Sequence, residues 1–264
     1  LSTVISLIGT GVAAGIIAII GTSGAIYLDV ITFILSALII STIHTYESKQ
    51  TAHKFDLKQY RLTLKEGMKY AFSQKTVLLF CLIALFLNGI IVPLNSLQAP
   101  LISEVLGGGA ASLSVMGISI SLSMLTGSVL YPMIHKKVTG KQLCIFGSIG
   151  LACFYLGIVA CRPFYTSELI SNIILAVLIF ILGFAVALIN SFASVELIKR
   201  VEQDYLARVV ALFTALTVAV NPVISFLLTG LTRILSTASI FLIAGILAVI
   251  MTFFMIANKT LKEV

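Results

Sequence analysis

The sequence predicts an all-α, polytopic membrane helix bundle of about eight spans. Of its 264 residues, 59% are hydrophobic and only 10% are charged, and the mean hydropathy is +1.14. Soluble domains are about 25% charged, so this composition excludes a soluble enzyme, a nucleic-acid-binding domain and a disordered protein. The apolar residues form continuous runs of about 20 residues, the length of a spanning helix. They do not alternate as in a membrane β-barrel.

Eight apolar runs define the expected spans, which must be helical because lipid offers backbone groups no hydrogen-bond partner. In chain order they are Thr3–Ile20, Ala25–Ile43, Thr76–Leu97, Ala110–Ile134, Leu143–Ala160, Leu169–Phe192, Val209–Leu231 and Ser236–Ile256. Only Gly21-Thr22-Ser23-Gly24 separates the first two spans, which predicts a tight antiparallel hairpin. The chain begins Leu1-Ser2 without a methionine and is already apolar, so we expect that it is cut into at its start.

The segment from His44 to Lys75 is the one sizeable polar stretch. Apolar residues recur in it at helical spacing, and a second face carries Lys58, Arg61, Lys65 and Lys69. This pattern predicts a short basic amphipathic helix on the cytoplasmic membrane surface. The helix is interpreted either as an element that couples two domains or as a solvated linker.

The positive charges indicate how the spans are oriented. Fifteen of the 17 Lys and Arg residues fall in alternate connecting segments and the tail, and only Arg162 and Arg233 fall on the opposite side. Because basic loops remain in the cytoplasm, this asymmetry places those segments and the C-terminus there. We therefore expect a multi-pass protein of the cell (cytoplasmic) membrane.

Signatures of catalysis, metal binding and nucleotide binding are absent from the sequence. There is no HExxH, GxSxG or CxxC motif, and Thr139-Gly140-Lys141 lacks the upstream glycine of a P-loop. We expect no enzyme activity, no catalytic residue, no metal, no cofactor and no nucleic-acid partner. The predicted environments are buried thiols for Cys81, Cys144, Cys153 and Cys161 and solvated cytoplasmic rings for His44, His53 and His135.

Polar residues inside spans are costly and usually face a bundle interior or a cavity. Asp29 is the one carboxylate clearly within an expected span. It is a candidate proton-coupling site, because burial raises the pKa of a carboxyl group. The alternative is a residue that hydrogen-bonds to a neighbouring helix.

Side-chain amides form a second polar set. The candidates for a substrate cavity are Asn88, Asn95, Gln98, Asn190 and Asn221. Asn88 and Asn95 are seven residues apart and share one helix face, and the helix-kinking prolines Pro93 and Pro222 lie close to amides. Amides beside kinks suit a cavity that binds a ligand by hydrogen bonds. The alternative is that they join one helix to another, which is typically worth under about 2 kcal/mol each.

Small residues indicate close helix packing. Gly11 and Gly15 form a GxxxG pattern in the first span, and Gly117 and Gly127 lie in the fourth. Such spacing allows two helices to approach closely. It occurs in many membrane proteins and does not indicate transport by itself.

Four stretches of the sequence resemble parts of one known protein family. They are Gly24 to Phe33 (GAIYLDVITF), Lys65-Glu66-Gly67, Asn88 to Val105 with Pro93-Leu94-Asn95 and Pro100-Leu101-Ile102-Ser103, and Asp204 to Val209 (DYLARV). The family is the major facilitator superfamily, in its macrolide-efflux-like branch. In chain order, the stretches resemble the start of its sixth span, the basic segment before the seventh, the seventh span with the external loop that follows, and the beginning of the eleventh span. Asn221-Pro222 falls where that branch has a proline in the eleventh span.

This resemblance implies a domain plan for the chain. Residues 1–43 would be the last two spans of an N-terminal bundle, 44–75 a cytoplasmic central loop, 76–258 a C-terminal six-helix bundle and 259–264 a cytoplasmic tail. The first four of twelve spans would be missing partners from the same protein. Lys136, Lys137, Asp204 and Arg208 would lie in cytoplasmic gate loops, although the loop motif after the eighth span lacks its aspartate.

The resemblance also implies a function. The expected activity is secondary active export of drugs or other lipophilic small molecules by alternating access, with protons as the candidate coupling ion. Its other partners would be membrane lipids. The alternative is a membrane sensor or scaffold that does not transport, and a permease of an ATP-driven exporter is a third reading for which no nucleotide-binding sequence is present.

Overall fold

A computed structural model of the protein describes residues 2–42 and 73–257, and all the regular structure in these two stretches is helical. The described residues contain seven helical segments long and apolar enough to cross a membrane, which confirms the predicted fold class. The chain divides into two compact units, Leu1–Leu62 and Thr63–Val264. The predicted amphipathic helix within residues 44–75 lies almost entirely outside the described residues, as do His44 and His53.

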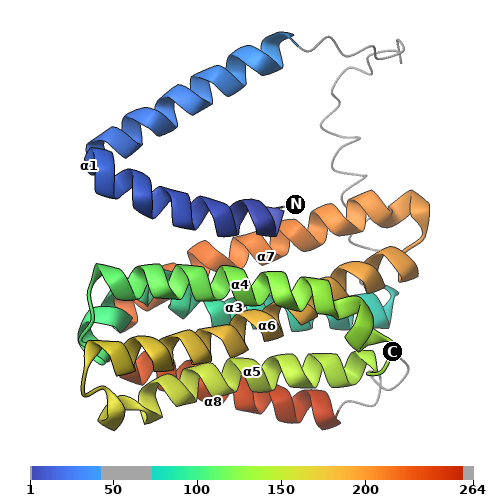
Figure 1. The fold of residues 1–264 in the computed structure, drawn as a ribbon. Helices are drawn as coiled ribbons and strands as arrows, with labels where there is room; N and C mark the ends of the chain where they lie inside the picture. The colour runs from blue at the N-terminus through green and yellow to red at the C-terminus, as the bar shows by residue number, and fades with distance from the viewer. Residues whose placement is uncertain (1, 43–72, 258–264) are drawn as a thin grey trace. The chain divides into compact units, whose positions relative to one another are not determined.

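The described part of the first unit is one helix, α1, which runs from Ser2 to Thr42. The predicted turn at residues 21–24 does not interrupt it, so the prediction of two separate helices is wrong. Instead, α1 bends sharply between two arms (Figure 1). A Cβ atom on Gly24 would lie 2.9 Å from the Ile20 Cβ, against about 5–6 Å for residues four apart on a straight helix. The missing side chain of Gly24 therefore permits the bend while helical hydrogen bonding continues.

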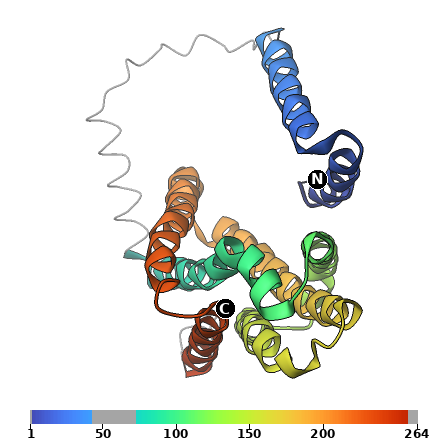
Figure 2. The same cartoon turned by 90° about the vertical axis from the view of Figure 1, so that its left-hand side faces the viewer.

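The second unit contains the remaining helices. They are α3 (Lys75–Pro100), the π-helical turn η1 (Leu101–Leu106), α4 (Ala110–His135), α5 (Gly140–Ala160), the 3-10 turn η2 (Arg162–Phe164), α6 (Glu168–Arg200), α7 (Gln203–Leu231) and α8 (Thr237–Ala257). α4 and α5 both pack along α6, α8 packs along α5, and α3 packs along α7 and α8. Figure 2 views this bundle roughly along the helix axes.

Two segments of the second unit are more helical than the sequence predicts. The residues after Pro100, expected in an external loop, form η1, whose Leu101, Ile102, Val105 and Leu106 are buried. η1 ends at Gly107, whose φ of 65° is a left-handed conformation that favours glycine. α6 continues to Arg200, eight residues beyond its predicted end, because the polar residues after Phe192 also suit a helix.

Buried aromatic rings on α5 and α8 form the centre of the core. The rings of Phe154 and Tyr155 lie 5.1 Å apart, and the Tyr155 ring lies 5.3 Å from that of Phe241 on α8. All three side chains are fully buried. α5 begins at a capping box, in which Thr139 and Gln142 satisfy each other's backbone N–H groups.

Glycines bring α4 and α5 close to α6 on two sides. A Cβ on Gly127 of α4 would lie 2.7 Å from the Ala187 Cβ of α6, and a Cβ on Gly150 of α5 would lie 2.5 Å from the Ala185 Cβ. Contacts this short cannot be made by any residue other than glycine without a backbone shift. In contrast, a Cβ on Gly117 would meet nothing within 4 Å, so this glycine makes no close contact within the described chain.

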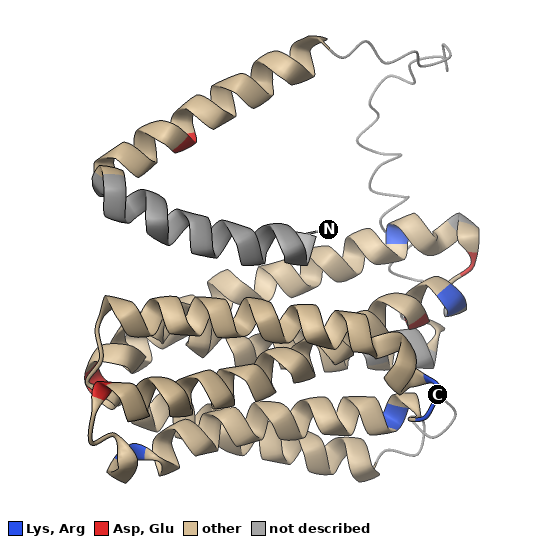
Figure 3. Cartoon of the chain, in the orientation of Figure 1, with Lys and Arg blue, Asp and Glu red and all other residues tan. Residues whose placement is uncertain are grey.

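Charged residues of the second unit gather at the two ends of the bundle (Figure 3). One end has the α4–α5 and α6–α7 connections, with Lys136, Lys137, Lys141, Lys199 and Arg208. The opposite end has Glu104, Arg162, Glu168 and Arg233. The middle of the bundle, which is uncharged in the figure, has the composition expected in the hydrocarbon core of a bilayer.

Candidate functional site

A cavity of about 390 Å³ lies inside the second unit, between α3, α4, α6 and α7, with one residue from α5. This volume falls in the range of small-molecule sites. No charged side chain is among its lining residues, most of which are aliphatic. Its polar groups belong to Asn88 and Asn95 on α3, Asn190 and Ser194 on α6, and Thr217 on α7. The structure therefore brings together three of the five predicted amides.

The hydrogen bonds around the cavity leave polar groups for a ligand. Asn88 Nδ2 donates to the Ala84 carbonyl over 2.8 Å, and the hydroxyls of Ser194 and Thr217 donate to carbonyls of their own helices. The side-chain carbonyl oxygen of Asn88 and the hydroxyl oxygens of Ser194 and Thr217 can therefore still accept hydrogen bonds from a ligand. Among the described residues, no hydrogen bond holds the side chain of Asn95 or Asn190. The cavity therefore offers both donors and acceptors, but no charge.

Helix geometry positions the α3 amides. Asn88 and Asn95 line the cavity one heptad apart, as their shared face predicts. Pro93 lies between them and has no backbone N–H group to donate to the Gly89 carbonyl. One backbone hydrogen bond of α3 is therefore missing at this turn. The buried Tyr155 of α5 donates its hydroxyl hydrogen to the adjacent Ile90 carbonyl. α5 therefore supports α3 at the interrupted turn.

Replacing Tyr155 by phenylalanine is expected to lower the free energy of unfolding by about 1 kcal/mol, because it removes one buried hydrogen bond without changing the packing volume. Reversible unfolding in mixed micelles would measure the change. The matched control is Tyr27→Phe, at a tyrosine that is 71% exposed. Equal stability of the two variants would contradict the support of α3 by Tyr155.

The other two predicted amides lie away from the cavity. Gln98 is exposed and donates through Nε2 to the Asn95 carbonyl, and Asn221 is exposed on α7 beside Pro222. Neither lines the cavity, because Leu97 has non-helical angles that rotate the end of α3, and the cavity residues of α7, Phe213 and Thr217, lie a turn or more earlier. Gln98 and Asn221 were predicted to line a substrate cavity, but neither lines this one.

Asp29 lies in α1, in the first unit, and is exposed. Its backbone carbonyl accepts a hydrogen bond of 2.7 Å from the Thr32 hydroxyl. No polar contact between the Asp29 carboxylate and another described residue is present. Gly11 and Gly15 are also in α1, in the stretch whose side-chain surroundings are not described.

A second carboxylate was missed by the sequence analysis. Glu196 is only 6% exposed and lies in α6, beyond the predicted end of that span. It acts electrostatically on Tyr131 of α4, whose buried hydroxyl has no hydrogen-bond partner among the described residues. Glu196 is therefore a second carboxylate to consider beside Asp29, close to the end of α6 and three residues before Lys199. The sequence spacing could have predicted the burial of Glu196, because Glu196 follows Phe192 by four residues and continues the buried face of α6 by one turn.

His135 does not have the solvated environment that was predicted for it. Its ring stacks on Tyr131 with centroids 5.3 Å apart and lies 6.3 Å from the Phe192 ring. Its Nδ1 atom is buried and has no hydrogen-bond partner among the described residues. The prediction was wrong because α4 includes His135, so the ring packs against α6 inside the bundle end.

The predicted gate residues lie at the same end of the second unit. Lys136 and Lys137 are exposed in the α4–α5 turn, and the Arg208 guanidinium lies 5.7 Å from the centroid of the Tyr205 ring. The side-chain surroundings of Asp204 are outside the described part. Of the four cysteines, all free thiols, Cys81 and Cys144 are buried as predicted, Cys161 is half-buried, and Cys153 is exposed, so the prediction for Cys153 is wrong.

Comparison with known protein families gives a match. The family model described as Major Facilitator Superfamily matches residues 1–216 of the chain. No curated protein matches the sequence. The matched region includes α1, all of α3 to α6 and the first half of α7, and thus all the cavity residues except Thr217.

Proposed function

The chain belongs to the Major Facilitator Superfamily, a family of membrane transporters, and on that premise we propose that it is part of a secondary active exporter of drugs or other lipophilic small molecules. Family membership favours transport over the alternative of a sensor or scaffold. The observation that carries the proposal is the uncharged cavity with amides from α3 and α6.

The chemistry of the cavity supports a lipophilic substrate. Its wall is mainly aliphatic, and its polar groups are neutral amides and hydroxyls. Such a wall binds apolar surface through burial and directs hydrogen bonds to a few polar groups of the ligand. A substrate that depended on a full charge would need a charged partner, which these walls do not provide.

The depth of the cavity supports alternating access. Asn88 lies near the middle of α3, and Thr217 lies near the middle of α7. Secondary transporters bind substrates near the bilayer midplane, where rocking of one bundle against another exposes the site to each side in turn. The second unit would supply one wall of such a site.

The test is an efflux assay on cells that express the gene encoding this chain. Membrane-permeant dyes and a panel of drugs would be loaded, and their accumulation compared with that in cells without the gene. We expect lower accumulation of uncharged lipophilic compounds and no change for strongly hydrophilic ones. Unchanged accumulation across the panel, with the protein present in the membrane, would refute the export of lipophilic compounds.

Proton exchange is the proposed coupling, with Asp29 as the candidate carboxylate. Asp29→Asn keeps hydrogen-bonding capacity but removes the titrating group. We expect it to lower drug resistance at least fourfold without reducing the amount of protein in the membrane. Susceptibility tests with immunoblots would measure both quantities. Glu168→Gln, in the first turn of α6, is the control for loss of a negative charge. Unchanged resistance and pH dependence in Asp29→Asn would remove Asp29 from the coupling step.

The proposed topology places Lys58, Lys137 and Arg200 in the cytoplasm and Glu104 and Arg162 outside, because positive charges gather at one end of the bundle. Single cysteines at these positions, in a background without the four native cysteines, should react accordingly with a membrane-impermeant thiol reagent. We expect labelling of intact cells only at 104 and 162. Labelling of intact cells at 137 or 200 would reverse the orientation.

A further inference from the structure

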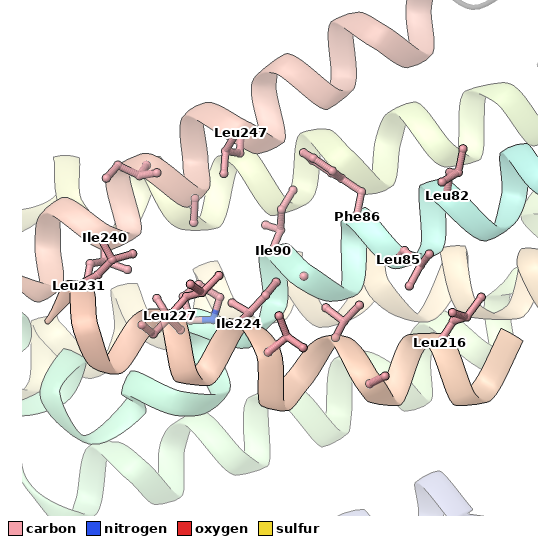
Figure 4. Close-up of a pocket in the computed structure, with 18 residues that line it drawn as sticks. Leu82, Leu85, Phe86, Ile90, Leu216, Ile224, Leu227, Leu231, Ile240 and Leu247 are labelled. Atoms are coloured by element: carbon pink, nitrogen blue, oxygen red, sulfur yellow. The ribbon is translucent and has the colours of Figure 1, made fainter. Parts of the chain in front are cut away.

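A second hollow lies on the outer side of the bundle, in a groove between α3, α7 and α8. Its volume is about 700 Å³, and all its lining residues are apolar. Leu82 and Phe86 of α3, Leu216 and Leu231 of α7, and Ile240 and Leu247 of α8 surround it (Figure 4). Within the groove α3 approaches α7 closely at Gly89, where a Cβ atom would lie 2.9 Å from the Ile224 Cδ1.

The groove is separate from the candidate cavity. Asn88 lines the cavity, whereas Gly89 and Pro93 line the groove, so the two hollows lie on different faces of α3. On α7, Thr217 lines the cavity and Leu216 the groove. No polar side chain lines the groove, which distinguishes its chemistry from that of the cavity.

The surroundings of the groove are the hydrocarbon core of the membrane. Its three walls belong to membrane-length apolar segments, Cys81–Leu106, Tyr205–Leu231 and Thr237–Ala257. Its residues extend along α3 from Leu82 to Pro93 and along α7 from Leu216 to Leu231, about 17 and 22 Å at 1.5 Å per residue. One leaflet contributes about 15 Å of the hydrocarbon thickness. The groove is therefore long enough and apolar enough to hold an acyl chain of one leaflet.

A cationic side chain lies at one end of the groove. Leu231 and Ile240 line that end, and the short turn between α7 and α8 that joins them contains the exposed Arg233. A guanidinium binds phosphate through paired hydrogen bonds. A carboxylate at this end of the bundle, that of Glu104, accepts a hydrogen bond from the Thr237 hydroxyl. The groove thus combines an apolar channel with a phosphate-binding group at the membrane surface.

We propose that this groove binds one phospholipid molecule, with an acyl chain between α3, α7 and α8 and its phosphate at Arg233. The inference depends on the membrane location of the helices, not on the transported substrate. Occupation would fill the hollow beside Pro93 and would stabilise the contact between α3 and α7.

The experiment uses the full chain reconstituted in bilayers that contain a phosphatidylglycerol with a photoactivatable diazirine in its acyl chain. After illumination, mass spectrometry locates the labelled peptides. We expect labelling of groove residues on α3, α7 and α8 at least fivefold above that of the apolar hollow between α5 and α8, which is lined by Cys153 and Ala160. That hollow is the internal reference for lipid that only surrounds the protein.

Two variants and a control complete the test. Ala219→Trp fills the groove from α7 and should reduce labelling of the groove at least fivefold, whereas Ala160→Trp, in the reference hollow, should leave it unchanged. Arg233→Gln should reduce groove labelling about threefold and abolish the preference for this lipid over a diazirine-bearing diacylglycerol without phosphate. Equal labelling of both hollows, cross-links to a second copy of the chain, or no effect of Ala219→Trp would overturn the proposal.

Discussion

Replacement of Gly127 by leucine is expected to lower the free energy of unfolding by about 3 kcal/mol, the largest stability effect that we predict. A Cβ at this position would lie 2.7 Å from the Ala187 Cβ and 3.1 Å from the Phe184 carbonyl oxygen of α6. Neither atom can move away by rotation of a side chain. The two helices must separate, and the neighbouring packing between α4 and α6 is lost with the contact.

Gly117→Leu is the matched control, because it makes the same exchange in the same helix. A Cβ there meets nothing within 4 Å, so its effect should stay within about 0.5 kcal/mol. Both variants gain the same helix propensity and hydrophobicity, and only the contact with α6 differs. Reversible unfolding in mixed micelles would measure both. Equal destabilisation of the two variants would contradict the close packing of α4 on α6.

Replacement of Asn190 by alanine is expected to reduce export of hydrogen-bonding substrates about tenfold, the largest effect on function that we predict. Asn190 lines the cavity, and no described residue holds its side-chain amide. Loss of one well-made hydrogen bond to a ligand corresponds to about 1–2 kcal/mol. Substrates without hydrogen-bonding groups should lose little, so the variant should also change which compounds are exported.

Asn221→Ala is the control for this prediction. Asn221 is also an exposed helical asparagine, but it does not line the cavity. Efflux rates over a range of substrate concentrations, normalised to protein in the membrane, would separate the two variants. If Asn221→Ala impaired export as strongly as Asn190→Ala, the cavity between α3, α4, α6 and α7 would not be the substrate site.

Hydrophobicity alone predicted the fold class and the approximate spans, because lipid forces long apolar runs into helices. Hydrophobicity could not predict how far a helix continues into polar sequence. For this reason the predicted span stopped at Phe192 and left out the last turns of α6, which contain Glu196. It also could not distinguish a turn from a bend at Gly24, since glycine permits both.

The cavity was predicted in part. A polar residue in an apolar helix usually faces the bundle interior or a cavity, and Asn88, Asn95 and Asn190 do line the cavity. Asn221 and Gln98 do not line it, because the cavity ends one turn before Asn221 along α7 and the non-helical Leu97 redirects the end of α3 before Gln98. The sequence of a single helix does not contain this information. The apolar groove beside Arg233 also escaped prediction, since residues that line a hollow have the same composition as residues that face lipid.

The distribution of prolines gives the two walls of the cavity different mechanical properties. α3 and α7, which pack on each other, carry Pro93 and Pro222 within their helices. α6 has no proline and is held by α4 and α5 through glycine contacts, and the proline of α4, Pro132, lies about two turns beyond its last cavity residue, Met124. A helix with a missing hydrogen bond bends at lower cost than a continuous one. We therefore expect α6 to form a stationary wall of the cavity, and α3 and α7 to form a wall that can bend. The width of the cavity would then change by bending of α3 and α7, while the amide of Asn190 on α6 keeps its place.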